Sequence, residues 1–234
     1  MQLFYNSELQ PSDKHFCFDK NESRHIVKVL RKNIGDKLRI TNGLGFIFDA
    51  EILTTNHNKC EVSITKTTVI PPKQYSIHLA VAPTKMNDRY EWFLEKATEI
   101  GVDQITPIIC ARSERKTVKT ERFEKIIHAA SKQSLRAHFP KINPTARFTD
   151  FIKNTTDNPC YIAHCLEQNQ PHLKDLIAPK KSVLILIGPE GDFTMDEINL
   201  AQTLGFESVS LGNARLRTET AAVVACHIIE LCNA

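Results

Sequence analysis

The sequence predicts an α/β protein in which a small β-rich domain, residues 1–70, precedes a larger α/β domain, residues 71–234. Short β-prone runs separated by turn signals fill the first part. From Ser76 onward, apolar runs alternate with helical patterns, which is typical of a mostly parallel sheet. Two of the later runs end in glycine loops, at Gly188–Gly191 and Leu211–Thr218. Open α/β sheets bind ligands at the carboxyl ends of their strands, so we expect the functional site there.

The composition is that of an ordinary soluble protein, with 41% hydrophobic and 24% charged residues in a chain of 234. This length allows two modest domains, each with a workable core. We expect neither a signal peptide nor a membrane span, because no run approaches the ~18 apolar residues of a span. Seven widely spaced cysteines without a CxxC pair indicate reduced thiols in the cytoplasm. Cys160, His164, Cys165 and His172 match no zinc spacing, so we expect no metal.

The first domain is predicted to be a small barrel of short strands. Its β-rich runs are Asp36–Thr41, Phe46–Leu53 and Cys60–Thr68, separated by turn signals rich in asparagine and glycine. On this pattern alone, the domain could equally be a folded interaction module. The domain is expected to end at Val69–Lys73, because the two prolines in this stretch prevent a central strand from running through.

A helix is predicted over Glu22–Lys32, ahead of these strands. Its apolar positions Ile26, Val29 and Leu30 are expected to face inward. The basic positions expected to face outward are Arg24, Lys28, Arg31 and Lys32.

The second domain is predicted to alternate strands with helices. The expected strands are Ser76–Ala82, Gln104–Cys110, Pro159–Ala163, Val183–Ile187 and Glu207–Leu211, and the expected helices are Asp88–Ile100, Glu121–Leu135, a helix from Thr194 to about Leu204, and one opening at Thr218. The stretch Thr194–Glu197 fits a capping box. Pro107 indicates that its strand lies at an edge or ends there. Trp92 and Phe93 are expected in the core rather than as base-stacking platforms, because they sit among apolar residues at packing spacing.

The charge distribution is uneven, and the excess of basic residues lies in the middle of the chain. Residues 71–160 hold 15 basic and 10 acidic side chains, and most of the excess falls between Arg112 and Arg136. Such a run suits a phosphate backbone. The alternative is a solvated helix face with pairs such as Glu121 and Lys125 four residues apart.

The two glycine loops are not phosphate-binding loops. Gly188–Gly191 lacks both the GxGxxG pattern and the lysine of a P-loop, so nucleotide phosphates are not the expected ligand. Glycines expose backbone N–H and C=O groups at close approach, which suits a purine edge and an amino acid carboxylate.

The sequence GPEG at Gly188–Gly191 and the sequence LGNARLRTETA at Leu211–Ala221 resemble the ribosomal RNA small subunit methyltransferase E family, within the SPOUT superfamily. The similarity extends upstream to Lys96–Val102, to Arg112-Ser113 and to 133–136. Two positions depart from the family pattern: Asp192 stands where a second glycine is usual, and Ala214 stands where an arginine is usual. Any role that this arginine has in the family would have to be supplied here by Arg215.

The resemblance implies a PUA-like RNA-binding β-barrel followed by a SPOUT methyltransferase domain with a trefoil knot, assembled as a homodimer. Periodicity alone would predict an unknotted doubly wound sheet. The implied cofactor is S-adenosylmethionine, held by Ile187, Gly188, Glu190, Gly191, Leu211, Gly212, Leu216 and Thr218. For Leu211 and Leu216, the alternative to contact with the cofactor is packing in the protein core. His164 or Cys165 could also border the site.

The implied reaction is methylation of a uridine N3 in 16S ribosomal RNA of the small subunit, at the family's uracil 1498 position in the decoding region. N3 lies on the pairing edge and carries a proton, so the base must be unpaired and a protein group must accept the proton or stabilise the anion. Candidate catalytic residues are Glu190 and Glu219 as bases and Arg217 as a donor to a uracil carbonyl. Alternatively, Glu219 only stabilises the start of its helix and pairs with Arg217, and alignment of the reactants supplies much of the rate.

The expected RNA-binding residues are Arg24, Lys28, Arg31, Lys32, Arg112 and Arg136. Two other functions stay open. One is a SPOUT methyltransferase acting on another RNA or on a ribose hydroxyl. The other is a non-catalytic RNA-binding member of the fold, which would have lost its activity together with the arginine that Ala214 replaces.

Overall fold

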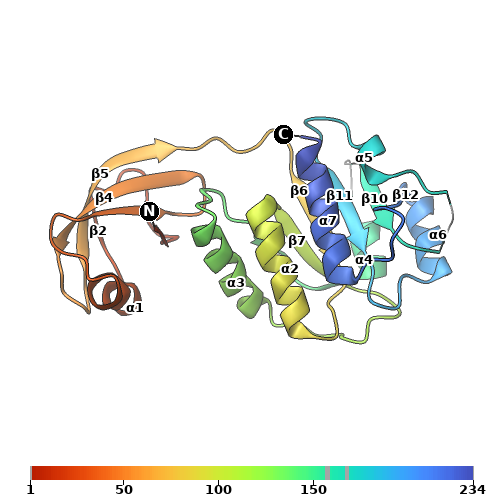
Figure 1. The fold of residues 1–234 in the computed structure, drawn as a ribbon, viewed down its shortest axis with the longest axis horizontal. Helices are drawn as coiled ribbons and strands as arrows, with labels where there is room; N and C mark the ends of the chain where they lie inside the picture. The colour runs from red at the N-terminus through yellow and green to blue at the C-terminus, as the bar shows by residue number, and fades with distance from the viewer. Residues whose placement is uncertain (1, 156–158, 167–168, 234) are drawn as a thin grey trace. The chain divides into compact units, whose positions relative to one another are not determined.

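The computed structural model describes residues 2–155, 159–166 and 169–233. The chain forms two units (Figure 1). The first unit contains residues up to Pro72 together with Ser131–Phe139, and the second contains Lys73–Ala130 and the chain from Pro140 onward. Within the described residues, no helix has both the length and the apolar character needed to cross a bilayer.

The first unit is built on a five-stranded sheet in the order β1-β3-β4-β5-β2. Its strands are β1 (Leu3–Tyr5), β2 (His15–Cys17), β3 (Lys37–Thr41), β4 (Phe46–Thr54) and β5 (Glu61–Val69). β1 runs parallel to β3, and the other neighbours are antiparallel. The three predicted strands are confirmed as β3, β4 and β5. Alternate residues of these strands, among them Ile40, Phe48 and Val62, are buried in one core.

The predicted helix at Glu22–Lys32 is shorter and less regular than its pattern suggested. It comprises α1 (Lys20–Arg24), capped by Asp19, and a π-helical turn, η1 (His25–Val29). A π turn holds one more residue than an α turn and rotates the residues that follow. Ile26 is buried as predicted, but Val29 is 67% exposed, so its expected inward position was wrong.

Ser131–Phe139 completes the first unit although it lies about 60 residues further along the chain than Pro72. The backbone N–H groups of Gly45 and Phe139 donate to Ala137 and Gly43, respectively, at 2.9 Å each. The rings of Tyr5 and Phe139 stack with centroids 4.6 Å apart. No local pattern in this stretch indicates these contacts, because hydrogen bonds between distant segments leave no periodic signal.

The second unit is built on a parallel sheet in the order β12-β10-β11-β6-β7-β8, with β9 also paired to β7. Its strands are β6 (Ile77–Val81), β7 (Gln104–Ile109), β8 (Lys141–Ile142), β9 (Ala146–Arg147), β10 (Cys160–Ala163), β11 (Val183–Ile187) and β12 (Glu207–Val209). Every pairing between these strands is parallel, as predicted. Pro107 pairs with β6 on one side. On the other side it falls in the gap between the short strands β8 and β9, so a proline is accommodated within the sheet.

Helices cover both faces of this sheet (Figure 1). They are α2 (Asn87–Ile100), α3 (Thr120–Gln133), α4 (Phe148–Lys153), α5 (Leu173–Leu176), α6 (Met195–Thr203) and α7 (Thr218–Leu231). α2 and α7 pack side by side over one face, and α4 and α6 cover the other. Sequence reasoning missed the short helices α4 and α5. It placed Phe93 correctly in the core, whereas Trp92 is 44% exposed, because the buried stripe of α2 runs through Tyr90, Phe93 and Leu94.

Candidate functional site

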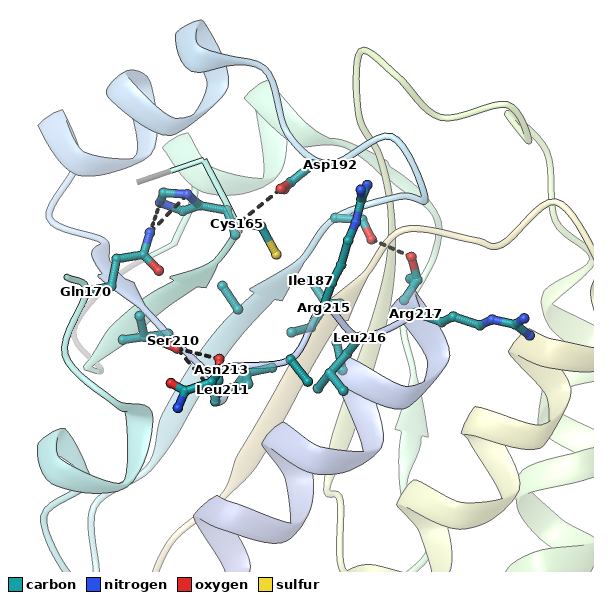
Figure 2. A pocket seen from close by; sticks show the side chains of 18 of the residues that line it. Cys165, Gln170, Ile187, Asp192, Ser210, Leu211, Asn213, Arg215, Leu216 and Arg217 are labelled. Atoms are coloured by element: carbon teal, nitrogen blue, oxygen red, sulfur yellow. Dashed lines mark hydrogen bonds between the residues drawn. The ribbon is translucent and has the colours of Figure 1, made fainter. Parts of the chain in front are cut away.

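A cavity of about 820 Å³ lies at the carboxyl edge of the parallel sheet, among the loops that follow β10, β11 and β12 (Figure 2). The predicted cofactor residues that line it are Ile187, Gly188, Glu190, Leu211, Gly212, Leu216 and Thr218. Gly191 instead faces Arg112, whose Cβ lies 3.3 Å from where a Cβ on this glycine would stand. His164 and Cys165 also line the cavity. The two glycine loops therefore meet in one site.

The loop after β11, residues 188–192, is packed tightly against a buried ring. A Cβ built on Gly188 would lie 3.0 Å from the ring of Phe193, which is fully buried. The side chain of Thr218, the first residue of α7, donates to the Gly188 carbonyl at 3.0 Å. A larger residue at Gly188 would thus distort the loop itself before it reached any ligand.

Arg112 supports the same loop from the segment after β7. Its Nη1 donates to the carbonyls of Gly191 at 2.9 Å and Phe193 at 3.2 Å. Beside it, the backbone N–H of Ala111 donates to Glu197 at 2.8 Å. Charge-assisted hydrogen bonds of this kind are stronger than neutral ones. The guanidinium that the sequence suggested for RNA binding is therefore engaged in holding the loop.

Glu190 is exposed and is also engaged with the backbone. Its Oε1 accepts a hydrogen bond from the N–H of Lys85, in the loop after β6, at 2.9 Å. The Lys85 ammonium pairs with Glu114 at 2.8 Å. One carboxylate oxygen of Glu190 is thus used to join two loops.

Asp192 joins the loops after β10 and β11. Its backbone has a φ of 63°, a left-handed conformation that aspartate tolerates better than most residues. Oδ2 accepts from the Cys165 N–H at 2.9 Å (Figure 2), and Oδ1 accepts from the Phe193 N–H at 2.8 Å. Burial and this carboxylate raise the pKa of the Cys165 thiol, against the opposing influence of Arg215. The only sequence signal for this role of Asp192 was its replacement of a glycine.

The loop after β12, residues 210–217, presents exposed side chains. Gly212 has a φ of 134°, which favours glycine, and a Cβ there would meet nothing within 4 Å. Its N–H donates to the hydroxyl of Ser210 at 3.1 Å. Ala214 and Arg215 are exposed and line the cavity, so a cation stands next to the position where the family usually has arginine. Arg217 is the N-cap of α7 and also lines the cavity.

His164 borders the cavity from the end of β10. Its ring is buried and lies 2.9 Å from the Ser208 hydroxyl, and the Gln170 amide lies 3.0 Å from both ring nitrogens (Figure 2). This side chain is therefore held among polar neighbours beside the cavity.

Glu219 lies in the first turn of α7 and is only 6% exposed. Its Oε1 lies 3.8 Å from Nε of Arg89 in α2. Among the described residues, its Oε2 is buried and has no hydrogen-bond partner. Sequence reasoning proposed Arg217 as the partner of Glu219 and did not identify Arg89, because helices α2 and α7 are far apart in sequence.

The basic residues suggested for RNA binding lie in both units. Arg24, Lys28 and Arg31 are exposed in the first unit, and Lys32 lies 3.9 Å from Asp36. Arg136 belongs to the same unit, where its Nε donates to the His138 carbonyl at 3.2 Å. Part of the central basic run forms ion pairs, with Arg122 bonded to Glu91 and Lys132 to Glu22. Part of the central basic run is thus a helix surface whose basic side chains form ion pairs with acidic ones.

Two family models match the chain. An RNA methyltransferase domain matches residues 71–230, and an RNA methyltransferase PUA domain matches residues 18–65. A ribosomal RNA small subunit methyltransferase E from Rickettsia conorii is 30% identical, over 98% of this chain and 95% of its own. The chain belongs to the ribosomal RNA small subunit methyltransferase E family. The resemblance drawn from the two glycine motifs is therefore confirmed.

Solved structures of related proteins share the whole fold. The crystal structure of a probable rRNA-methyltransferase from Porphyromonas gingivalis is 41% identical, covers 99% of each chain and has a TM-score of 0.91. A methyltransferase E from Neisseria gonorrhoeae, crystallised with S-adenosyl methionine, is 26% identical over 100% of this chain and 98% of its own, with a TM-score of 0.90. The predicted PUA-like domain and α/β methyltransferase domain of this methyltransferase E member are confirmed.

Proposed function

We propose that the protein is an S-adenosylmethionine-dependent methyltransferase that modifies N3 of a uridine in 16S ribosomal RNA. The observation that carries this proposal is the cavity of about 820 Å³ in which both glycine motifs meet. A related protein of the same fold is crystallised with S-adenosyl methionine. We further propose that the protein acts in the cytoplasm on the small ribosomal subunit, as a homodimer with a trefoil knot, and that its domains are residues 1–70 and 71–234.

The lining of the cavity suits this cofactor. Ligand cavities commonly measure roughly 300–1,000 Å³ and combine apolar walls with a few polar groups. Ile187, Leu211 and Leu216 supply apolar surface for an adenine, and the glycines bring backbone N–H and C=O groups near its polar edge. The carboxylates of Glu190 and Asp192 stand at the wall, where they favour cationic groups. When bound, the cofactor supplies an electrophilic methyl group on a positively charged sulfur.

The protein's part of the reaction is to hold the uracil and remove its N3 proton. N3 loses the proton to a carboxylate, and the electron pair left on N3 forms the new bond to carbon as the sulfur–carbon bond breaks with its pair on sulfur. Between the two candidate bases, Glu219 is favoured, because its Oε2 is buried and without a hydrogen-bond partner among the described residues. Glu190 is exposed and already accepts from the Lys85 N–H.

Arg217 is proposed to stabilise the negative charge that spreads to the uracil carbonyls. It lines the cavity as the N-cap of α7, beside the first helical turn that carries Glu219. A donor placed at developing charge lowers the barrier without any reorganisation during the reaction. Arg24, Lys28, Arg31 and Lys32 of the first unit are proposed to contact RNA phosphates, with Arg112 and Arg136 as further candidates.

The proposal is tested by mass spectrometry of 16S ribosomal RNA from a strain that lacks the gene. We expect one N3-methyluridine to be missing, to return fully with the wild-type gene, and to return only in part with Arg217→Ala. A non-catalytic RNA-binding role is the second candidate, since Ala214 replaces the usual arginine. An unchanged set of modified nucleotides in the strain would favour that role.

A further inference from the structure

A second hollow, of about 500 Å³, lies on the face of the parallel sheet that α4 and α6 cover. We call it the His78 pocket, and it shares no lining residue with the cavity of about 820 Å³. His78 of β6 and Leu184 of β11 line it, two residues before Ala80 and Leu186, which are buried on the same face. The His78 pocket therefore lies toward the amino ends of the strands, whereas the two glycine loops meet at their carboxyl ends.

A chain of hydrogen bonds fixes the polar side of the His78 pocket. The Thr106 hydroxyl accepts from Nδ2 of Asn143 at 2.8 Å and lies 2.7 Å from Nε2 of His78. Its own hydrogen is donated to Nε2, because no other acceptor for it is present among the described residues. In the neutral ring the remaining hydrogen then sits on Nδ1, and burial favours this neutral form by lowering the pKa of His78 to about 4.

Three polar groups of the pocket remain available to a ligand. The Nδ1–H of His78 is a donor that has no acceptor within the part of the chain that the structure describes. In the same part of the chain, no donor is bonded to Oδ1 of Asn143 or to the exposed carboxylate of Asp150. The pocket thus offers mainly acceptor oxygens, with one donor, and favours a ligand rich in hydrogen-bond donors.

The rest of the pocket is apolar, with a cation beside it. Its apolar lining consists of Pro144, Ala146, Phe151 and Leu184. The Phe151 ring meets the His78 ring edge to face, with centroids 5.7 Å apart. Lys141 lies on the same face of β8 as Asn143, because Ile142 between them packs into the core on the opposite face. Apolar walls with a few polar groups, in a volume of this size, are typical of small-molecule sites.

We propose that the His78 pocket binds the guanine base of a nucleotide. Guanine is the RNA base whose pairing edge carries two adjacent donors, N1–H and the N2 amino group, next to the acceptor O6. The Asp150 carboxylate accepts from both donors, the Nδ1–H of His78 donates to O6, and Lys141 pairs with the phosphate. Adenine and cytosine present an unprotonated ring nitrogen at this edge, which would face the carboxylate and be repelled.

Nucleotide titrations test the base that the pocket selects. Guanosine, inosine and adenosine monophosphates are titrated into the full-length protein by calorimetry, with saturating S-adenosylmethionine so that nucleotides do not enter the cavity at the glycine loops. Guanosine monophosphate should bind most tightly, inosine monophosphate, which lacks the N2 amino group, several-fold more weakly, and adenosine monophosphate at least about tenfold more weakly. Equal affinities for all three, or binding that S-adenosylmethionine abolishes, would overturn the assignment.

Asp150→Asn tests the carboxylate without disturbing the core, because this side chain is exposed. The amide keeps one acceptor and loses the charge, so the affinity for guanosine monophosphate should fall by roughly tenfold. Asp196→Asn is the matched control, since Asp196 is also an exposed acid in the first turn of a helix, α6, and does not line the pocket. It should bind as wild type does. Equal affinities in the two variants would contradict the role of Asp150.

Ala146 allows the hollow to be filled without removing a polar group. Ala146→Leu should lower the affinity for guanosine monophosphate by more than about tenfold, because the larger side chain occupies the space of the ring. Ala146→Ser, which stays small, should bind as wild type does, and thermal unfolding checks that both variants are folded. Wild-type affinity in a folded Ala146→Leu protein would place the nucleotide elsewhere.

The guanine can come from a free nucleotide or from RNA, and trinucleotides distinguish the two sources. A trinucleotide with a central guanine that binds more tightly than guanosine monophosphate, and more tightly than the same trinucleotide with a central adenine, would assign the pocket to RNA. Weaker binding of the guanine trinucleotide than of the free nucleotide would assign it to the free form. Failure of both guanine ligands to bind would refute the pocket.

Discussion

The two loops that meet in the cavity of about 820 Å³ differ in how their polar groups are used. In the loop after β11, Glu190 accepts from Lys85, Asp192 accepts from Cys165, and Arg112 donates to the carbonyl of Gly191. The loop after β12 instead presents exposed side chains at 213–215 and at Arg217. The first loop is thus a frame fixed by contacts to other segments, whereas the second offers side chains to a ligand. Changes in the frame should act on cofactor affinity and stability, and changes in the second loop should act on rate.

The largest expected effect is that of Arg217→Ala in the second loop. Removing a donor to developing charge typically lowers the rate by on the order of 100-fold or more. Affinity for cofactor and RNA should change little, because the contact is made mainly in the transition state. Single-turnover methylation of small subunits, with cofactor affinity from calorimetry, measures both quantities. A rate within a few-fold of wild type would mean that Arg217 has a structural role and does not stabilise the transition state.

Arg112→Ala tests the frame and should have the next largest effect. It removes two charge-assisted hydrogen bonds to the carbonyls of Gly191 and Phe193. Because the side chain is partly open to solvent, we expect a loss of cofactor affinity of roughly tenfold. The single-turnover rate at saturating cofactor should stay near that of wild type. Arg112→Lys, which keeps the charge but not the fork of donors, is the control and should recover only part of the affinity.

Asp192 offers a finer test of the frame. Asp192→Asn tolerates the left-handed backbone and keeps one acceptor oxygen, which can retain the bridge to Cys165 while the bond from the adjacent Phe193 N–H is lost. Calorimetry should therefore give cofactor affinity close to that of wild type. Asp192→Gly relieves the backbone but removes the bridge to Cys165, and should weaken cofactor binding by several-fold, equivalent to ~1 kcal/mol. Equal affinities in all three proteins would show that the bridge between the loops has no effect on the site.

The smallest effect, per residue, is expected for the basic side chains of the first unit. Each lost phosphate contact should flatten the slope of log affinity against log salt by roughly 0.7–0.9. Reversing the charge of Arg31 and Lys32 should therefore lower the slope while the cofactor affinity stays unchanged. An unaltered slope would exclude Arg31 and Lys32 from the RNA interface, and a changed cofactor affinity would contradict the division of roles between the loops and the first unit.

Local signals in the sequence were sufficient for much of the fold and for the two glycine loops that line the cavity. The capping box of Thr194 and Glu197 is present with both reciprocal hydrogen bonds, and α7 begins at Thr218 as predicted. β11 spans Val183–Ile187 as predicted, because a short run of only apolar residues is typical of a buried strand. These features are set by residues within a few positions of one another.

The predictions that failed, and the contacts that were missed, depend on distant or irregular structure. Val29 is exposed because a π turn interrupts the expected periodicity. Trp92 lies one position outside the buried stripe of its helix. The bonds from Arg112 to the first loop, and from Asp192 to Cys165, join segments 27 to 81 residues apart. Sequence patterns do not carry such pairings.

The most direct test of the proposed function is methyl transfer by the purified protein to small subunits from a strain that lacks the gene. With S-adenosylmethionine present, we predict one methyl group per subunit, located by mass spectrometry on N3 of a single uridine, and a transfer rate lower by on the order of 100-fold with Arg217→Ala. Methylation of a ribose hydroxyl, or no transfer by the wild-type protein to these subunits, would contradict the assignment.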